Sequence, residues 1–179
     1  MTLKLPRTIR LDASDDFAFD VAASPGEWAV PGAFAFLDED ARTLTGKRRQ
    51  AFRNGFLGLD SLGWSTLVTV AEVTPDVRDG VVEALAHRFV FRFGAPDLDA
   101  ARPVARDEVA FAMSLCDHPV NTILAVERSA DDDGGIRESF RVIEPPRTVD
   151  GQAPHAAIWA VETAEEPDIV RIATGGRLG

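Results

Sequence analysis

The chain contains one cysteine and no tyrosine. A single cysteine cannot form a disulfide within the chain, and a protein without disulfides fits the reducing cytoplasm. The absence of tyrosine removes one possible proton donor from any active site. Lysine occurs only at positions 4 and 47, so nearly all of the basic side chains are arginines. We therefore predict a cytoplasmic protein.

Long apolar runs are also missing. No segment approaches the ~18–20 consecutive apolar residues that a membrane-spanning helix needs. The N-terminal sequence MTLKLPRTIRLDASDD lacks the apolar stretch of a secretion signal. Lys and Arg number 19 against 29 Asp and Glu, which gives a net charge of -10. Because nucleic acids and anionic lipids present negative phosphates, we predict neither a nucleic-acid partner nor a membrane partner.

The common cofactor and catalytic motifs are absent. The segment ARTLTGKR departs from the phosphate-binding loop at Ala41 and at Arg48. The segment GWSTL departs from the nucleophile elbow G-x-S-x-G at Leu67. The sequence also has no G-x-G-x-x-G after a strand, no H-E-x-x-H and no C-x-x-C. These absences favour a protein that is not an enzyme, and we predict no cofactor and no metal.

Apolar residues spaced two apart predict several strands. In the segment WAVPGAFAF, for example, Trp28, Val30 and Phe36 fall on one face, while Pro31 and Gly32 require an edge position or a bulge. The predicted strands cover residues 8–11, 17–22, 28–36, 64–73, 121–129, 136–143 and 155–163.

Three helices are predicted between these strands. Thr45 caps a short helix that stops near Asn54, and residues 55–63 follow as a loop. A second helix begins at Thr74-Pro75, and its end at residues 89–93 also alternates as a strand would; we keep the helix. A third helix covers residues 100–116.

Strands at both ends of the chain and helices between them predict an α+β fold. We expect a single domain with a mostly antiparallel sheet and a central pair of helices packed on it. The sequence ADDDGG predicts a hairpin between the strands at 121–129 and 136–143. The domain is predicted to cover residues 1–164, and residues 165–179 form a C-terminal tail that is partly ordered as a short strand.

Cys116, Asp117 and His118 are the nearest approach to a reactive cluster. One interpretation is a thiolate activated by His118, or a pair of metal ligands. The interpretation that we favour is core packing, because Cys116 continues the apolar face of its helix and free cysteine is often buried. We predict that Cys116 is buried and unreactive.

The segment GKRRQAFRNGFLGLDSLGW is the strongest candidate binding site. Arg49 and Arg53 lie four residues apart, so a helix brings both guanidinium groups towards one anion. Gly55 and Gly58 would let the backbone approach a ligand, and Trp64 would supply an aromatic wall. The simpler alternative, which we favour, is a solvated helix face followed by glycines that serve tight turns.

The segments GKRRQAF, GFLGLDSLGWSTLV, FGAPD, LCDH and IRESFRVIE together resemble an uncharacterised bacterial family of unknown function. The resemblance extends from about Leu5 to Glu144. The family has no assigned activity, so the resemblance implies no catalytic residue. It implies a link to redox chemistry, since relatives lie near genes for molybdenum-dependent formate dehydrogenase and its maturation.

Two functions are predicted from different classes. The first is a non-catalytic accessory or interaction protein with a protein partner, linked to assembly of a redox enzyme. The second is a small-molecule or anion-binding protein, enzymatic or not, with its site at Arg49, Arg53 and the GFLG loop. A homo-oligomer is compatible with both.

Overall fold

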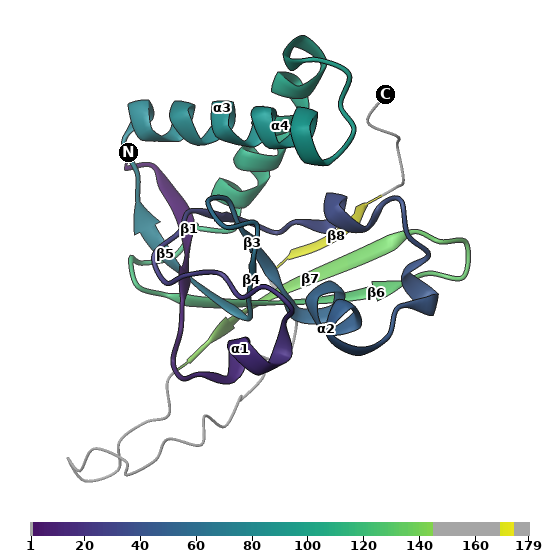
Figure 1. Cartoon of the computed structure of the whole chain (residues 1–179). Helices are drawn as coiled ribbons and strands as arrows, with labels where there is room; N and C mark the ends of the chain where they lie inside the picture. The colour runs from purple at the N-terminus through teal and green to yellow at the C-terminus, as the bar shows by residue number, and fades with distance from the viewer. Residues whose placement is uncertain (1, 145–168, 174–179) are drawn as a thin grey trace, which may run out of the picture.

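The computed structural model describes residues 2–144 and 169–173 (Figure 1). Its strands are β1 Lys4–Ile9, β2 Ala29–Val30, β3 Phe56–Gly58, β4 Trp64–Ser65, β5 Leu67–Glu72, β6 Ile123–Ala130, β7 Ile136–Ile143 and β8 Ile169–Ala173. Its helices are α1 Ser14–Ala18, α2 Gly46–Asn54, α3 Pro75–Arg92 and α4 Leu98–Ser114, with 3₁₀ turns η1 Ala33–Phe36 and η2 Ala41–Thr43. The strand predicted at 155–163 lies outside the described residues.

The strands form two antiparallel sheets. One sheet has five strands in the order β1-β5-β6-β7-β8, and the other has three in the order β2-β3-β4. The predicted hairpin is β6–β7, closed by a hydrogen bond from Asp131 N to Gly135 O of 2.7 Å, with Gly134 at φ 88°. The prediction of a single α+β domain with a mostly antiparallel sheet is therefore confirmed.

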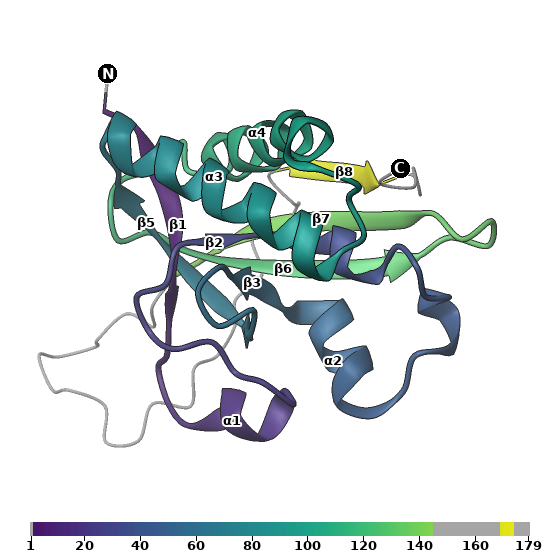
Figure 2. The same cartoon turned by 45° about the horizontal axis from the view of Figure 1, so that its top comes forward.

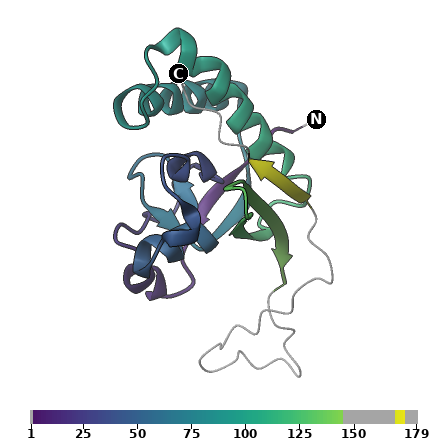
Figure 3. The same ribbon diagram turned by 90° about the vertical axis from the view of Figure 1, so that its right-hand side faces the viewer.

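The long helices α3 and α4 lie together on one side of the strands, and α1 and α2 lie on the other (Figures 1 and 2). Figure 3 shows the same separation from the side. The buried apolar face of α3 includes Leu85 and Phe89, and that of α4 includes Ala105 and Val109. Among the described residues, no helix combines the length and the apolar content needed to cross a bilayer.

Local capping explains why α3 and α4 were predictable, whereas Thr45 occupies the N-cap of α2 as predicted but makes no side-chain capping hydrogen bond. The side chain of Thr74 accepts a hydrogen bond from Val77 N, and Pro75 occupies the first turn of α3. Asp97 accepts from Ala100 N at the start of α4. The helix predicted through residues 89–93 is also confirmed, since α3 continues to Arg92 with Phe89 buried.

Two strands predicted in the first third are wrong. Residues 17–22 were expected in a strand, but Phe17 lies on helix α1. The strand expected at 28–36 pairs only at Ala29–Val30. It ends there because Gly32 adopts a left-handed φ of 85° and turns the chain into η1. A Cβ atom on Gly32 would lie 2.8 Å from Leu57 Cβ, so this turn also permits close packing.

The stretch between residues 55 and 73 also differs from the prediction. The expected loop at 55–63 contains β3, and the single strand expected at 64–73 divides at Thr66 into β4 and β5. The carboxylate of Asp15 accepts hydrogen bonds from both the backbone N–H and the hydroxyl of Thr66. Because this N–H donates to a side chain, it cannot pair with a neighbouring strand. The chain therefore passes from one sheet to the other at Thr66.

A fully buried ion pair joins the two sheets. Arg128 and Glu138 lie opposite each other in the β6–β7 register, and Arg128 Nε donates to Glu138 Oε2 at 2.9 Å. Arg128 Nη1 donates to the carbonyl oxygens of Phe52 at 3.0 Å and Gly55 at 2.7 Å, and Nη2 donates to that of Pro31. Carbonyl groups at the end of α2 that no helical N–H can reach are thereby satisfied.

Replacing Arg128 with methionine should destabilise the protein strongly. The change removes the guanidinium that neutralises Glu138 and the donor for three backbone carbonyls. Loss of one member of a buried ion pair costs about 3–5 kcal/mol. Urea denaturation measures this free energy of unfolding. The control is Arg137→Met on the same hairpin, because Arg137 is half exposed and its nearest carboxylate oxygen, on Asp131, is 3.9 Å away. Equal losses of stability in the two variants would contradict the stabilising role of the buried ion pair.

Candidate functional site

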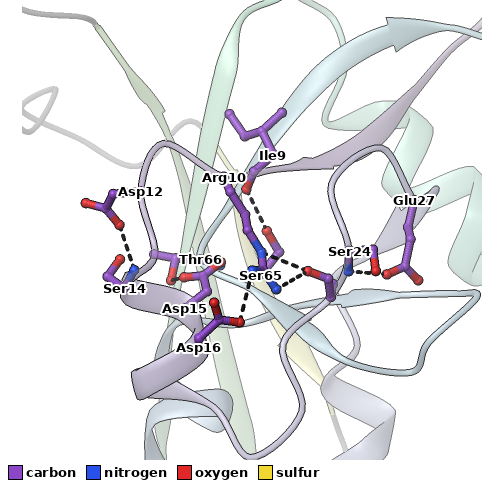
Figure 4. A network of polar contacts seen from close by, with 11 residues as sticks. Ile9, Arg10, Asp12, Ser14, Asp15, Asp16, Ser24, Glu27, Ser65 and Thr66 are labelled. Atoms are coloured by element: carbon purple, nitrogen blue, oxygen red, sulfur yellow. Dashed lines mark hydrogen bonds and ion pairs between the residues drawn. The ribbon is translucent and has the colours of Figure 1, made fainter.

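The N-terminal segment before β2 is held against the sheets by buried polar contacts (Figure 4). Asp15 is the buried residue of α1, with 5% of its surface exposed. Its Oδ1 accepts from Thr66 Oγ1 at 2.6 Å, and its Oδ2 accepts from Thr66 N at 3.3 Å. The orientation of α1 is therefore fixed by a side chain that points into the protein.

Arg10 fixes the same segment from the other end. Its Nε and Nη2 donate to Ala23 O at 3.1 and 2.8 Å, and its Nη1 lies 2.9 Å from Asp16 Oδ1. Asp12 Oδ1 accepts from Ser14 N at 2.8 Å. Hydrogen bonds from the side chain and the backbone of Ser14 lower the pKa of the Asp12 carboxyl below its usual value. The hollow beside these groups, about 140 Å³, is small.

Glu27 closes the segment against the loop that follows β3. The side chain is 5% exposed, and its carboxylate accepts from Ser24 N, Asp60 N, Ser61 N and Ser61 Oγ at 2.6 to 3.0 Å. A Cβ atom on Gly58 would lie 2.8 Å from Glu27 Oε1. Gly58 therefore makes room for this carboxylate.

Apolar side chains project to solvent from this fixed segment. Phe17 is 78% exposed, Val21 53% and Leu11 40%. Exposed carboxylates are interspersed with them. We call this set the α1 surface; it consists of Leu11, Asp12, Asp16, Phe17, Asp20 and Val21. The sequence predicted a strand at residues 17–22, and no signal in the sequence marks Phe17 as exposed.

The residues of the predicted binding site are divided between the core and the surface. Trp64 is 6% exposed, and its ring lies 5.1 Å from that of Phe36. A Cβ atom on Gly55 would lie 2.8 Å from Trp64 Cε3, so Gly55 gives space to this ring rather than to a ligand. Arg49 and Arg53 are exposed on α2. The structure thus brings Gly55 and Trp64 together, but not with the two arginines.

The arginines of α2 differ in their contacts. Arg48 Nη2 lies 2.7 Å from Glu39 Oε2, and its guanidinium carbon is 4.2 Å from the centre of the Phe36 ring. Within the described part of the chain, the guanidinium groups of Arg49 and Arg53 make no hydrogen bond or ion pair. An anion site at Arg49 and Arg53 therefore stays a prediction.

The burial predicted for Cys116 is confirmed. The residue is 2% exposed, and its Sγ lies 3.6 Å from Ala112 O. Burial raises the pKa of the Cys116 thiol to about 12, against a smaller opposite effect of Lys4. The helix ends at Ser114, so Cys116 packs just beyond it. In residues 2–144 and 169–173, no group of three or more His, Cys, Asp and Glu could hold a metal.

Comparison with known proteins gives a family but no activity. A sequence profile of a family of unknown function, DUF6505, matches residues 1–160. The chain belongs to DUF6505. No curated protein and no solved structure matches it. The DUF6505 match includes the α1 surface, α2 and both long helices, which agrees with the resemblance to an uncharacterised family.

Cys116 should react slowly with a thiol reagent in the folded protein. With a pKa of about 12, the thiol stays neutral at pH 8, and its burial blocks access. Labelling by 5,5′-dithiobis(2-nitrobenzoate), followed by absorbance, should become rapid only in denaturant. Because the folded pKa lies above the ordinary value of 9.0, stability from this group should persist below pH 9 and fall as the pH rises towards 12. Rapid labelling of one thiol in native buffer would contradict this.

Proposed function

We propose that the protein is a non-catalytic interaction protein that binds a partner protein through the α1 surface. The observation that carries the proposal is Phe17, a large aromatic side chain with 78% of its surface exposed on a helix that is fixed from within by Asp15. Exposed apolar patches mark interaction sites, and Leu11, Phe17 and Val21 are all exposed within the short stretch of residues 11–21.

The rigidity of the α1 surface supports this proposal. Binding is weakened by the entropy lost when loops and side chains become ordered, at about 0.5–1.5 kcal/mol for each immobilised side chain. The contacts of Asp15 with Thr66 and of Arg10 with Ala23 order this backbone before a partner arrives. An aromatic anchor on a preorganised backbone is typical of binding hot spots.

Charge indicates the chemistry of the partner. Asp12, Asp16 and Asp20 are exposed beside the apolar side chains, and among the described residues only Asp16 forms an ion pair, with Arg10 at 2.9 Å. A complementary surface would offer an apolar pocket for Phe17 with basic residues at its rim. A link between this partner and the assembly of a redox enzyme stays a prediction from the sequence resemblance.

A photo-crosslinking amino acid at position 17 should capture the partner from an extract of the source cells. We expect one protein to be crosslinked at position 17. Added salt should reduce the yield of this crosslink, because the rim of the surface is charged. The matched control is position 91, because Phe91 is equally exposed, at 77%, but lies on α3. The same products at both positions, or none at position 17, would overturn the proposal.

An anion site on α2 is the second candidate function. Arg49 and Arg53 are one helical turn apart, and no described residue pairs with their guanidinium groups. Arg48 is already engaged by Glu39 and would not take part. Two free guanidinium groups on one face suit a phosphate or a carboxylate.

Phosphate should raise the melting temperature if this second site exists, because a ligand of the folded state stabilises it by mass action. Arg53→Ala should then remove the gain, whereas Arg92→Ala, on another helix, should keep it. The measurement is thermal unfolding in phosphate and in chloride at matched ionic strength. An equal response to the two salts would exclude the anion site and leave a solvated helix face.

A further inference from the structure

A second concave site lies between α3 and α4. These two helices lie on the side of the strands opposite to α1 (Figure 2). Its volume is about 680 Å³, within the range of roughly 300–1,000 Å³ that is usual for small-molecule pockets. The lining residues are Arg78, Asp79, Val82, Glu83, Arg106, Val109, Ala110 and Met113. None of these residues belongs to the sites considered above.

The hollow lies away from the connection between the two helices. The connection is short, residues 93–97, and Arg102 Nε near the start of α4 binds Glu83 Oε1 in the middle of α3 at 2.8 Å. The hollow lies beyond this ion pair, towards the free ends of the helices. Its floor consists of side chains of small or moderate size, with Val109 buried and Ala110 exposed. Longer apolar side chains at these positions would fill the space.

The rim of the hollow carries four charges, of which three are engaged. Arg78 Nη2 lies 2.8 Å from Asp79 Oδ1. Glu83 is held by Arg102, whose hydrogen bond lowers the pKa of the Glu83 carboxyl, with a smaller contribution from Arg106. Arg106 itself is exposed and forms no ion pair within 4 Å among the described residues. The charge at the rim that is free for a ligand is therefore positive.

We infer that this hollow binds an anionic amphiphile, a molecule with a carboxylate head and an apolar chain. The carboxylate would accept hydrogen bonds from Arg106, and the chain would cover Ala110 and Met113, the apolar lining residues that are not buried. A cationic head is disfavoured because it would have to displace Arg78 from Asp79 or Arg102 from Glu83. A head group without a chain would leave the apolar surface of Ala110 and Met113 in water.

Calorimetric titration with decanoate, below its critical micelle concentration, tests the inference. We expect one molecule of decanoate per chain. Decyltrimethylammonium has the same chain with a positive head, and acetate has the head without a chain; both should bind at least about tenfold more weakly, since a charged hydrogen bond and a buried chain each exceed 1.4 kcal/mol. Equal binding of decanoate and decyltrimethylammonium, or no binding of decanoate, would overturn the inference.

Two variants locate the site. Arg106→Gln removes the charge and should weaken decanoate at least about tenfold. Ala110→Phe places a ring in the hollow from an exposed position and should abolish binding. The matched control, Arg92→Gln, removes an exposed arginine from the same helix pair and should bind normally. Unchanged melting temperatures verify that the variants are folded. Normal binding of decanoate by Arg106→Gln or by Ala110→Phe would contradict the placement of the decanoate site in this hollow.

Discussion

The buried ion pair between Arg128 and Glu138 is the contact on which the arrangement of the two sheets depends. Both residues belong to the five-stranded sheet, but the remaining donors of Arg128 reach the three-stranded sheet. Pro31 directly follows β2, and Gly55 directly precedes β3. One guanidinium therefore fixes the end of β2 and the start of β3 relative to the larger sheet.

The position of the smaller sheet in turn determines which side of α2 faces solvent and which side faces the core. The C-terminal turn of α2 is bound through the carbonyl of Phe52, so the helix presents Arg49 and Arg53 to solvent and its apolar side to Phe36. Taking a guanidinium and a carboxylate out of water costs several kcal/mol for each ion. This cost is offset by the ion pair together with hydrogen bonds to three carbonyl groups. A lysine could not offer that number of donors in one plane.

The position of the α1 surface depends indirectly on the same arrangement of the two sheets. Thr66, which binds Asp15, lies where the chain leaves the smaller sheet for the larger one. The helix that carries Phe17 is therefore attached at the junction of the two sheets. The hollow between α3 and α4 lies on the other side, so a ligand there and a partner at α1 would not compete.

Elements that depend on short-range interactions could be predicted from the sequence, whereas elements that depend on distant contacts could not. The helices α2, α3 and α4 and the β6–β7 hairpin were predicted, because caps and turn residues act within a few positions. The apolar periodicity at 28–36 was misleading because the left-handed turn at Gly32 packs on Leu57, far along the chain. A contact between residues so far apart in the sequence cannot be recognised from a segment of ten residues.

The site residues were harder to predict than the fold. Phe17 was expected in a strand, since nothing local reveals that it projects outward from a helix whose Asp15 points inward. Trp64 was expected at a ligand and instead fills the space left by Gly55. The burial of Arg128, in contrast, could have been predicted from the sequence. Side chains alternate between the two faces of a strand, so Arg128 lies on the same face of β6 as the buried residues Leu124 and Val126.

Native-state hydrogen exchange of an Arg128→Lys variant tests the role of the guanidinium most directly. Lysine keeps the charge opposite Glu138 but cannot bind the carbonyls of Pro31, Phe52 and Gly55 together. The account predicts faster exchange first of all in the amides of the last turn of α2 and of β3, with α3 and α4 retaining their protection. Unchanged exchange around Gly55, or equal acceleration of all protected amides, would contradict it.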